Sequence, residues 1–357
     1  MAQFIYVEIK EYLMRLIKEN RSNPDYMLPS ENKLAVKFAT TRITAKRALN
    51  ELQQEGYIVR KHGKGSFINQ AAVKDAFSQT GEFICLMLPN IDSIFVSRIV
   101  KGVRDTCMQY GYTPLIVNEP NLQSNLIAEI TKRDIKGMIV FPNSKTNYNK
   151  DLLSLSFKNF PMIFVDRYMS GLEVSSVSSN HEEAGRLAVR ILSERGCQHI
   201  GFITSPAPYT SSARERIFGY EREHIENQML IRNDYILEVS KQDEDIDEKL
   251  IRYFKEHPEI DGLLSYGDII GIHVYKAIAA CKIRVPEQMK VIFLDDEYAN
   301  YADILPFSPS CIIQQSREIG RQAASLLIKY ITRQIKHDEK IQLDYQFIER
   351  ESTKMKE

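Results

Sequence analysis

The chain has 357 residues, 43% of them hydrophobic, which is long for one small domain and enough for a substantial core. Its formal net charge is zero, but residues 1–70 carry twelve Lys and Arg against seven Asp and Glu. That front segment is therefore net +5 and the remainder net −5, an asymmetry that suits a polyanionic partner at the front. No segment approaches the roughly 18 apolar residues of a membrane span, so we expect no membrane partner.

The cysteines form no Cys-x-x-Cys pair and no Cys/His cluster; they are Cys85, Cys107, Cys197, Cys281 and Cys311. We interpret them as free thiols in a reducing compartment, and we expect no metal and no cofactor. The first twenty residues mix charges through their apolar positions, which is typical of an amphipathic helix and not of a secretion signal. The sequence therefore predicts a cytoplasmic protein.

Two helices and a hairpin are predicted near the front of the chain. Ser30 is a candidate N-cap of a helix over Glu31–Ala39, with Glu31 at the positive end of the helix dipole. Thr41 is a candidate N-cap of a second helix that ends at Gly56. One face of that helix is predicted to be buried: Ala45, Ala48, Leu49 and Leu52. Two short strands around a Gly-Lys-Gly turn then form a basic hairpin.

This order predicts a head that reads DNA through its second helix and grips phosphates or the minor groove with its hairpin. The expected DNA contacts are Ser30, Glu31, Thr41, Arg42, Thr44, Lys46, Arg47, Lys61, His62, Gly63 and Lys64. For Glu31, a charge that stabilises the helix and a base contact are equally good interpretations. For the basic residues the plain alternative is a solvated helix face, which the charge of the segment and the hairpin beside it argue against.

Leu-Pro-Ser-Glu at 28–31, Arg42 with Thr44, Glu-Gly-Tyr at 55–57 and Gly-Lys-Gly-Ser-Phe-Ile at 63–68 resemble the winged-helix head of the GntR family. The resemblance implies a winged helix-turn-helix domain over residues 1–70 that binds double-stranded operator DNA. Thr40-Thr41 stands where the family usually has Val-Ser, and residues 23–26 lack the usual glycine.

Residues 71–82 are predicted to be a linker, and beyond them short apolar runs alternate with helical stretches. The predicted strands are 83–88, 114–117, 137–141, 162–165, 200–204, 262–265 and 291–294, and the helices include 95–110, 182–195, 212–227 and 269–281. Strand and helix in alternation predict an α/β fold of parallel sheets with right-handed crossovers. The number of units predicts two sheets.

Ligands of such sheets bind beyond the carboxyl ends of the strands. The segments just after the predicted strands are rich in Asp, Asn, Arg and Ser and include an aromatic residue: 90–95, 142–143, 166–167, 205–209, 266–268 and 295–296. Carboxylates and amides hydrogen-bond pairs of hydroxyls, and an aromatic face covers the apolar side of a sugar ring. The sequence therefore predicts a polar, polyhydroxylated ligand.

Val-Asp-Arg at 165–167, Asn180 before Ala-Gly at 184–185, and Phe-Leu-Asp-Asp at 293–296 resemble the effector-binding region of the LacI/GalR repressors across residues 83–350. That region is built like a type I periplasmic binding protein. The resemblance implies two Rossmann-like subdomains and ligand contacts at Phe95, Arg167, Arg216, Asp295 and Gln314, with Asp92, Ser93, Asn180 and Asp268 nearby. Ser93-Ile94 replaces the family's Asn-Pro, and the hinge helix rich in alanine and leucine is lacking.

Plain alternatives stand beside these assignments. Asp295 also suits a helix cap, Arg216 a salt bridge along its helix, and Phe95 ordinary core packing. The histidines show no metal-ligand spacing and are expected to be structural or on the surface.

A GntR-type head on a LacI-type body resembles the arabinose-repressor type of regulator. We therefore expect a homodimeric repressor that releases its operator when it binds a monosaccharide, for which L-arabinose and L-fucose are the examples the resemblance offers. An activator or co-repressor-type regulator has the same architecture. An enzyme with a DNA-binding head would need a pyridoxal phosphate lysine motif, which we do not find. A transport binding protein does not fit the basic head.

Overall fold

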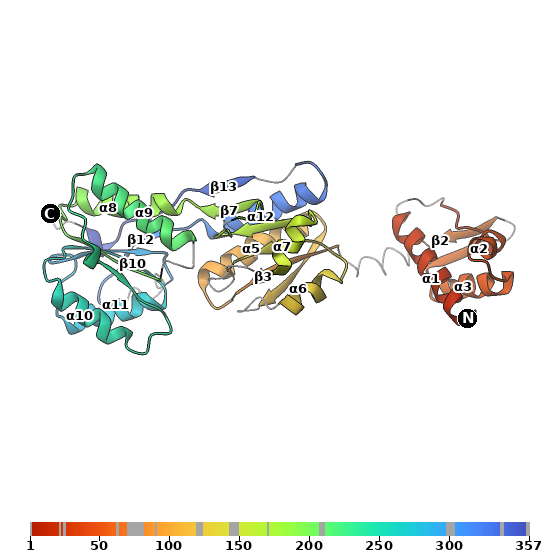
Figure 1. Ribbon diagram of the computed structural model, residues 1–357, viewed down its shortest axis with the longest axis horizontal. Helices are drawn as coiled ribbons and strands as arrows, with labels where there is room; N and C mark the ends of the chain where they lie inside the picture. Colours follow the sequence, from red (N-terminus) through yellow and green to blue (C-terminus); the bar gives the residue numbers. More distant parts are fainter. Residues whose placement is uncertain are drawn as a thin grey trace. The chain divides into compact units, whose positions relative to one another are not determined.

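The computed structural model describes residues 2–20, 23, 26–61, 64–69, 82–89, 91–118, 124–142, 150–169, 171–206, 211–297, 304–335 and 339–354 (Figure 1). The chain divides into two compact units, Met1–Gly81 and Glu82–Glu357. The linker expected at 71–82 lies outside the described residues except for Glu82, which is the first residue of a strand.

The described residues of the first unit form three helices and a two-stranded hairpin. Its elements are α1 (Ala2–Glu19), α2 (Glu31–Lys37), α3 (Arg42–Gln54), β1 (Ile58–Lys61) and β2 (Gly65–Ile68), with β1 and β2 antiparallel. Side chains from all three helices and both strands form one buried core, among them Leu13, Leu34, Leu49, Ile58 and Ile68. This is the winged helix-turn-helix that the sequence predicted.

Both predicted caps of this unit are formed. Ser30 Oγ accepts a hydrogen bond from the Lys33 amide at 3.4 Å, and Thr41 Oγ1 accepts one from the Thr44 amide at 3.3 Å. The four positions expected to be buried on α3 are buried. The prediction of a helix through residue 39 was too long, because α2 ends at Lys37 and Ala39 has a left-handed φ of +47°.

The second unit begins with a six-stranded sheet in the order β13-β7-β6-β5-β3-β4, in which all neighbours are parallel. Its strands are β3 (Glu82–Leu88), β4 (Tyr112–Asn118), β5 (Ile135–Val140), β6 (Met162–Val165), β7 (Ser176–Ser179) and β13 (Lys340–Leu343). On one face lie α5 (Ile94–Gln109) and α12 (Ser316–Ile331); on the other lie α6 (Ser124–Thr131) and α7 (Lys150–Phe157). These elements form the first lobe.

A second sheet of six strands has the order β14-β12-β11-β10-β8-β9. Its strands are β8 (Ile200–Thr204), β9 (Ile236–Glu238), β10 (Gly262–Tyr266), β11 (Lys290–Leu294), β12 (Ser310–Ile313) and β14 (Gln346–Ile348). Figure 1 shows α8 (His181–Glu194) and α9 (Ser211–Glu226) on one face, with α10 (Ile246–Glu256) and α11 (Ile269–Ala280) on the other. These elements form the second lobe, so each lobe is a helix–sheet–helix sandwich.

The chain crosses between the lobes three times: after β7, after β12, and between β13 and β14. The crossings are tied together, since the Asn180 amide donates to Leu343 O at 3.0 Å and Gln315 Nε2 donates to Asp344 O at 2.9 Å. The predicted parallel sheets are confirmed, and β14, a strand that the sequence did not predict, adds an antiparallel pair with β12. The reason is topological: β12 leads out of the second lobe, whereas β14 enters it.

Short 3-10 helices lie at Asn233–Tyr235 and Glu351–Thr353 of this unit. The second of them extends the body past the expected end at residue 350. Ser352 Oγ donates to Val291 O at 2.6 Å and accepts from the Ser310 amide at 2.7 Å, so this segment is bonded to β11 and β12.

The helix pair on one face of each lobe crosses at glycines. A Cβ atom built on Gly219 of α9 would lie 1.9 Å from Glu182 O, and one on Gly185 of α8 would lie 2.1 Å from Arg216 O. The α5–α12 pair of the first lobe has the same arrangement. A Cβ atom built on Gly102 would lie 2.1 Å from Arg317 O, and one on Gly320 would lie 2.2 Å from Ile99 O. Glycine lets the two backbones touch, so these crossings set how closely each helix pair packs.

We expect Gly219→Ala to destabilise the second lobe, because the added methyl must displace backbone and not a flexible side chain. Overpacking of this kind costs about 1–3 kcal/mol. Gly271→Ala in α11 is the matched control, since its Cβ would meet its nearest atom at 3.2 Å. Thermal unfolding of both variants measures the difference; equal melting temperatures would contradict the tight crossing.

Candidate functional site

One face of α3 is exposed and cationic. The Arg42 side chain is 69% exposed, and Lys46 and Arg47 are exposed, while Thr44 is half-buried. The Arg47 guanidinium lies 5.0 Å from the ring of Tyr6 on α1, a cation–π distance that directs this arginine toward α1. Arg42 and Lys46, four residues apart, extend from the same solvent-facing side.

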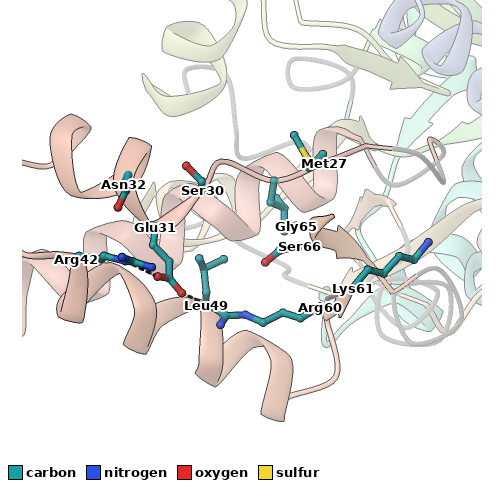
Figure 2. Close-up of a pocket in the computed structure, with 11 residues that line it drawn as sticks. Met27, Ser30, Glu31, Asn32, Arg42, Leu49, Arg60, Lys61, Gly65 and Ser66 are labelled. Atoms are coloured by element: carbon teal, nitrogen blue, oxygen red, sulfur yellow. Dashed lines mark hydrogen bonds and ion pairs between the residues drawn. The ribbon is translucent and has the colours of Figure 1, made fainter. Parts of the chain in front are cut away.

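Glu31 lies between the exposed helix and the hairpin. Its Oε2 accepts a hydrogen bond from Arg42 Nε at 2.9 Å, and its Oε1 pairs with Arg60 Nη2 at 3.3 Å, as Figure 2 shows. The hydrogen bond from Arg42 holds the pKa of the Glu31 carboxyl below its usual value. Glu31 thus stays ionised and links α3 to β1, across a groove of about 640 Å³ that also reaches Lys61 and Gly65.

The hairpin pairs Arg60 with Ser66 and Lys61 with Gly65. The Lys61 ammonium lies 4.8 Å from the ring of Phe67, and the Lys64 amide donates to Lys61 O at 2.9 Å, which closes the turn. Lys61 and Lys64 are exposed. The predicted contacts His62 and Gly63 lie outside the described residues. The described basic residues of the wing are therefore available to a phosphate backbone.

In the second unit, two strands end in aspartates with the same unusual backbone, of which Asp166 is buried and Asp295 is half-buried. Asp166 follows β6 with φ +64°, and Asp295 follows β11 with φ +69°. Each is thus the residue just after a central strand, one in each lobe. The left-handed conformation is costly for residues other than glycine, and aspartate is among those that tolerate it best.

Arg216 of α9 is 4% exposed and lies near both aspartates. Its Nη1 donates to the Tyr266 hydroxyl at 2.8 Å, and its Nη2 donates to the Tyr345 hydroxyl at 3.0 Å. Neither bond is the salt bridge along the helix that we weighed as the alternative. A buried guanidinium requires compensating charge and acceptors, which Asp166, Asp295 and the two tyrosines supply.

A chain of hydrogen bonds continues from Arg216 to the first lobe. Tyr345 OH lies 2.9 Å from His181 Nδ1, and His181 Nε2 lies 2.8 Å from Asp166 O. Because the carbonyl can only accept, Nε2 carries the proton, so Nδ1 accepts from Tyr345. Every donor in this relay then points the same way, from Arg216 toward Asp166. Burial lowers the pKa of His181 to about 4, so the ring is neutral at pH 7.

Asp295 is held by Gln314 at the end of β12. The Gln314 backbone amide donates to Oδ1 at 3.2 Å, and its side-chain Nε2 donates to Oδ2 at 2.9 Å. Burial raises the pKa of the Asp295 carboxyl, and the charge of Arg216 and the Gln314 bonds oppose that shift. The structure therefore brings Arg216, Asp295 and Gln314 together. The described hydrogen bonds of Asp295 go to Gln314 and do not support the alternative that Asp295 caps a helix.

Arg167 and Phe95 lie on the side of the first lobe. Arg167 Nε is 3.2 Å from Asp166 Oδ2, and its guanidinium is 5.3 Å from the ring of Phe141. Phe95 packs edge-on against Phe141, with centroids 6.3 Å apart. Phe95 is half-buried beside the main core of the lobe, so packing accounts for part of its role.

Other predicted ligand residues are engaged as helix caps. Ser93 Oγ accepts from the Val96 amide at 3.1 Å, Asn180 Oδ1 from the Glu183 amide at 3.1 Å, and Asp268 Oδ1 from the Ile270 amide at 3.0 Å. Asp268 also pairs with Lys241, and Asp92 is exposed. Because Ser93, Asn180 and Asp268 accept these helix-cap hydrogen bonds, they have fewer free acceptor positions for a ligand.

The cluster around the two aspartates holds several buried polar atoms that make no hydrogen bond to the described residues. They are Asp166 Oδ1, Arg167 Nε, Ser179 Oγ, Arg216 Nε and Gln314 Oε1. Buried polar groups are rarely left this way unless water or a ligand completes them. The set contains both donors and acceptors, as hydroxyl groups require.

Sequence reasoning missed Tyr345 and did not select Tyr266 from its candidate segment. It treated the histidines as structural, and His181 is buried and hydrogen-bonded on both nitrogens. Within the described ranges, no group of three His, Cys, Asp or Glu side chains is placed to hold a metal ion. Nor does that part of the chain contain a helix long and apolar enough to cross a bilayer.

Two family models match the chain. Residues 5–68 match that of the bacterial regulatory proteins of the gntR family, and residues 189–353 match that of a periplasmic binding protein-like domain. The chain joins a gntR-family head to a periplasmic-binding-protein-like body. Both resemblances inferred from the sequence are confirmed.

Curated proteins that are similar to this chain match it over most of their length. The arabinose metabolism transcriptional repressor of Geobacillus stearothermophilus is 23% identical over 337 residues, 91% of each chain. The ribose operon repressor of Halalkalibacterium halodurans is 24% identical over 320 residues, 88% of this chain and 92% of that one. The chain is a transcriptional regulator and not an enzyme.

Solved structures of regulators show the same fold. CcpA of Lactococcus lactis superposes with a TM-score of 0.68 at 19% identity, covering 77% of this chain and 100% of that one. CelR in complex with cellobiose superposes with a TM-score of 0.68 at 20% identity, covering 91% and 100%. At these identities the likeness establishes the fold, and the predicted α/β body of two parallel-sheet lobes is confirmed, apart from β14.

The buried neutral His181 predicts a pH dependence of stability. Its folded pKa, about 4, is below the unfolded value of 6.5, so the unfolded chain takes up the proton first. The free energy of unfolding should fall as the pH falls from 6.5 to 4, by up to about 1.4 kcal/mol per pH unit from this group. Denaturant unfolding of wild type and His181→Gln across that range measures it.

His273→Gln is the comparison variant for that experiment, because it replaces a histidine of α11 whose Nδ1 pairs with Asp247. We expect His273→Gln to keep the part of the slope that His181 contributes, whereas His181→Gln removes it. A wild-type slope equal to that of His181→Gln would contradict the neutral, buried ring.

Proposed function

We propose that the chain is a dimeric, sugar-responsive transcriptional repressor that acts in the cytoplasm. Its cationic winged helix binds an operator, and a monosaccharide bound between the lobes of the body weakens that binding. The observation that carries the proposal is the cluster of buried Arg216 and Gln314 with half-buried Asp295, in which hydrogen-bond donors and acceptors are left open, in a chain whose head exposes Arg42 and Lys46.

On the DNA side, we assign base contact to α3 and phosphate contact to the wing. Thr41 and Ser30 cap α3 and α2, so their hydroxyls lie where helix N-termini approach phosphates. Arg42, Thr44, Lys46 and Arg47 extend from the first two turns of α3, the part of a recognition helix that reaches base edges. Two heads of a dimer would bind two half-sites of a near-palindromic operator.

Glu31 fits best as a residue that positions Arg42 and Arg60, since both its oxygens are engaged by these arginines. This assignment replaces the two equal interpretations that the sequence left open for it. A bidentate arginine–guanine contact depends on the orientation of the guanidinium, which an ionised Glu31 restrains.

On the effector side, we assign ligand contact to Arg216, Asp295, Gln314 and Arg167, with Phe95 or Phe141 against the apolar face of the ring. Asp92, Ser93, Asn180 and Asp268 are assigned to the rim of the site. Two arginines and two aspartates leave the cluster without net charge, which favours a neutral polyhydroxylated ligand over a phosphorylated one. Pentoses and deoxyhexoses such as L-arabinose or L-fucose fit this description.

The two lobes are held at the site's edge by bonds that a closing motion would alter. Arg98 of α5 pairs with Asp296 at 2.9 Å, and the Tyr168 hydroxyl donates to Glu215 of α9 at 2.8 Å. Closure around a sugar would turn the lobes about the three crossings and change the path of the chain leading to the heads. A thousandfold loss of operator affinity needs about 4 kcal/mol of difference between the sugar affinities of the two conformers.

Substitutions in the head should separate base reading from phosphate contact. We expect Arg42→Ala to weaken specific operator binding by about 1–3 kcal/mol and to relax base preference. Lys64→Ala should instead lower affinity for operator and random duplex alike, with a smaller salt dependence. Binding titrations on both duplexes at several salt concentrations measure this; equal losses of Arg42→Ala on the two would contradict base reading.

Substitution of Asp295 should remove the sugar response and keep operator binding. Asp295→Ala removes the carboxylate, and Asp295→Asn is the milder variant because asparagine tolerates the left-handed backbone. The measurement is a gel-shift titration with the monosaccharide that gives the largest thermal shift in a panel including L-arabinose and L-fucose. A ligand at 100 times its Kd adds about 2.7 kcal/mol of stability, enough to detect.

Asp245→Asn, an exposed aspartate just before α10, is the matched control and should respond to sugar as the wild type does. A normal sugar response in both Asp295 variants would exclude the assigned site. A panel without any thermal shift would argue against a monosaccharide effector.

A further inference from the structure

The exposed face of α3 carries one large apolar side chain among its basic ones. Ile43, the second residue of the helix, is 80% exposed and directly follows Arg42. Lys46, Arg47 and Asn50 are exposed as well, and they come three, four and seven residues later, so they share its side of the helix. Ile43 does not belong to the core of the head as far as that unit is described.

Folding gives no reason for an isoleucine at this position. A β-branched side chain has a lower helix propensity than Ala, Lys or Arg, and its exposed surface gains nothing from water. Val36 of α2 is exposed to the same degree, at 82%, but it lies in the last turns of its helix and not on α3. Ile43 is therefore the large apolar residue at the N-terminal end of α3, where a recognition helix meets the bases.

The position of Arg42 makes Ile43 more prominent. Glu31 draws the Arg42 guanidinium toward the groove that Arg60 and Lys61 also line (Figure 2). Ile43 therefore presents its aliphatic side chain next to Arg42, whose guanidinium is directed toward the wing.

We propose that Ile43 reads thymine: its side chain packs against the C5-methyl group of a thymine in each operator half-site, near the base that Arg42 contacts. That methyl is the one apolar group that base edges display in the major groove. The proposal rests on the proposed function, since it requires α3 to enter the major groove. It adds a specificity-determining residue that makes no hydrogen bond to DNA.

The test begins with selection of duplexes from a random-sequence pool by the full-length wild-type protein. The selected duplex is then made with each thymine replaced in turn by deoxyuridine, which lacks only the C5-methyl. We expect one position per half-site at which the replacement weakens wild-type binding about fourfold, the effect of burying one methyl-sized group. Ile43→Ala should bind the thymine duplex several-fold more weakly and should not distinguish thymine from uracil at that position.

Val36→Ala is the matched control: it also shortens an exposed aliphatic side chain on a helix of the head, and it should keep the wild-type discrimination. Three results would overturn the proposal: a selected sequence without any uracil-sensitive thymine, an Ile43→Ala variant that still prefers thymine, or a Val36→Ala variant that loses the preference equally. Failure of the wild type to enrich any sequence would instead overturn the proposed regulatory function, so the two failures are distinct.

Discussion

Arg216 is a buried guanidinium whose described hydrogen bonds go to two tyrosine hydroxyls, and it is the charge that residues from both lobes surround. A charge at this depth requires opposite charge and acceptors from several directions. Asp295 comes from one lobe and Asp166 from the other, while Tyr345 comes from a crossing between them. The three crossings are what allow residues so distant in sequence to surround one side chain. The strands and helices of both lobes thus bring to their junction the charges and hydrogen-bond acceptors that the buried Arg216 requires.

The sequence was most informative where structure is determined locally. Ser30 and Thr41 cap their helices because cap chemistry involves residues three apart, and the strands at 162–165 and 200–204 are fully buried apolar runs with the predicted bounds. β7 was missed because Ser176–Ser179 is a buried strand made largely of serines, whose hydroxyls hide the hydrophobic pattern. β13 and β14 were missed because they are short, partly polar edge strands that exist through pairing with distant strands.

For the site, too, the sequence was informative about locally determined features and uninformative about contacts between distant segments. Asp295 and the Asp166-Arg167 pair directly follow strands, as the sequence predicted, and their role as ligand residues stays a prediction that rests on parallel strands bringing their carboxyl ends to one edge. Three further candidates, Ser93, Asn180 and Asp268, are chemically suited to ligands and to helix N-caps alike, and the sequence could not separate the two uses. The residues around Tyr345 in the sequence give no indication of its hydrogen bonds. Tyr345 contacts Arg216 and His181 because the third crossing passes between them, and these three segments meet only in the folded chain.

Asp166 and Asp295 both end a strand with a positive φ, in equivalent places of the two lobes. Glycine would adopt that backbone without strain, and asparagine would keep the shape without the charge. Both replacements would remove a carboxylate whose charge offsets that of the buried Arg216 guanidinium. The strained backbone at these two strand ends is therefore retained together with the charges that Arg216 requires, and neither replacement would keep both the stability of the body and the electrostatics at the junction of the lobes.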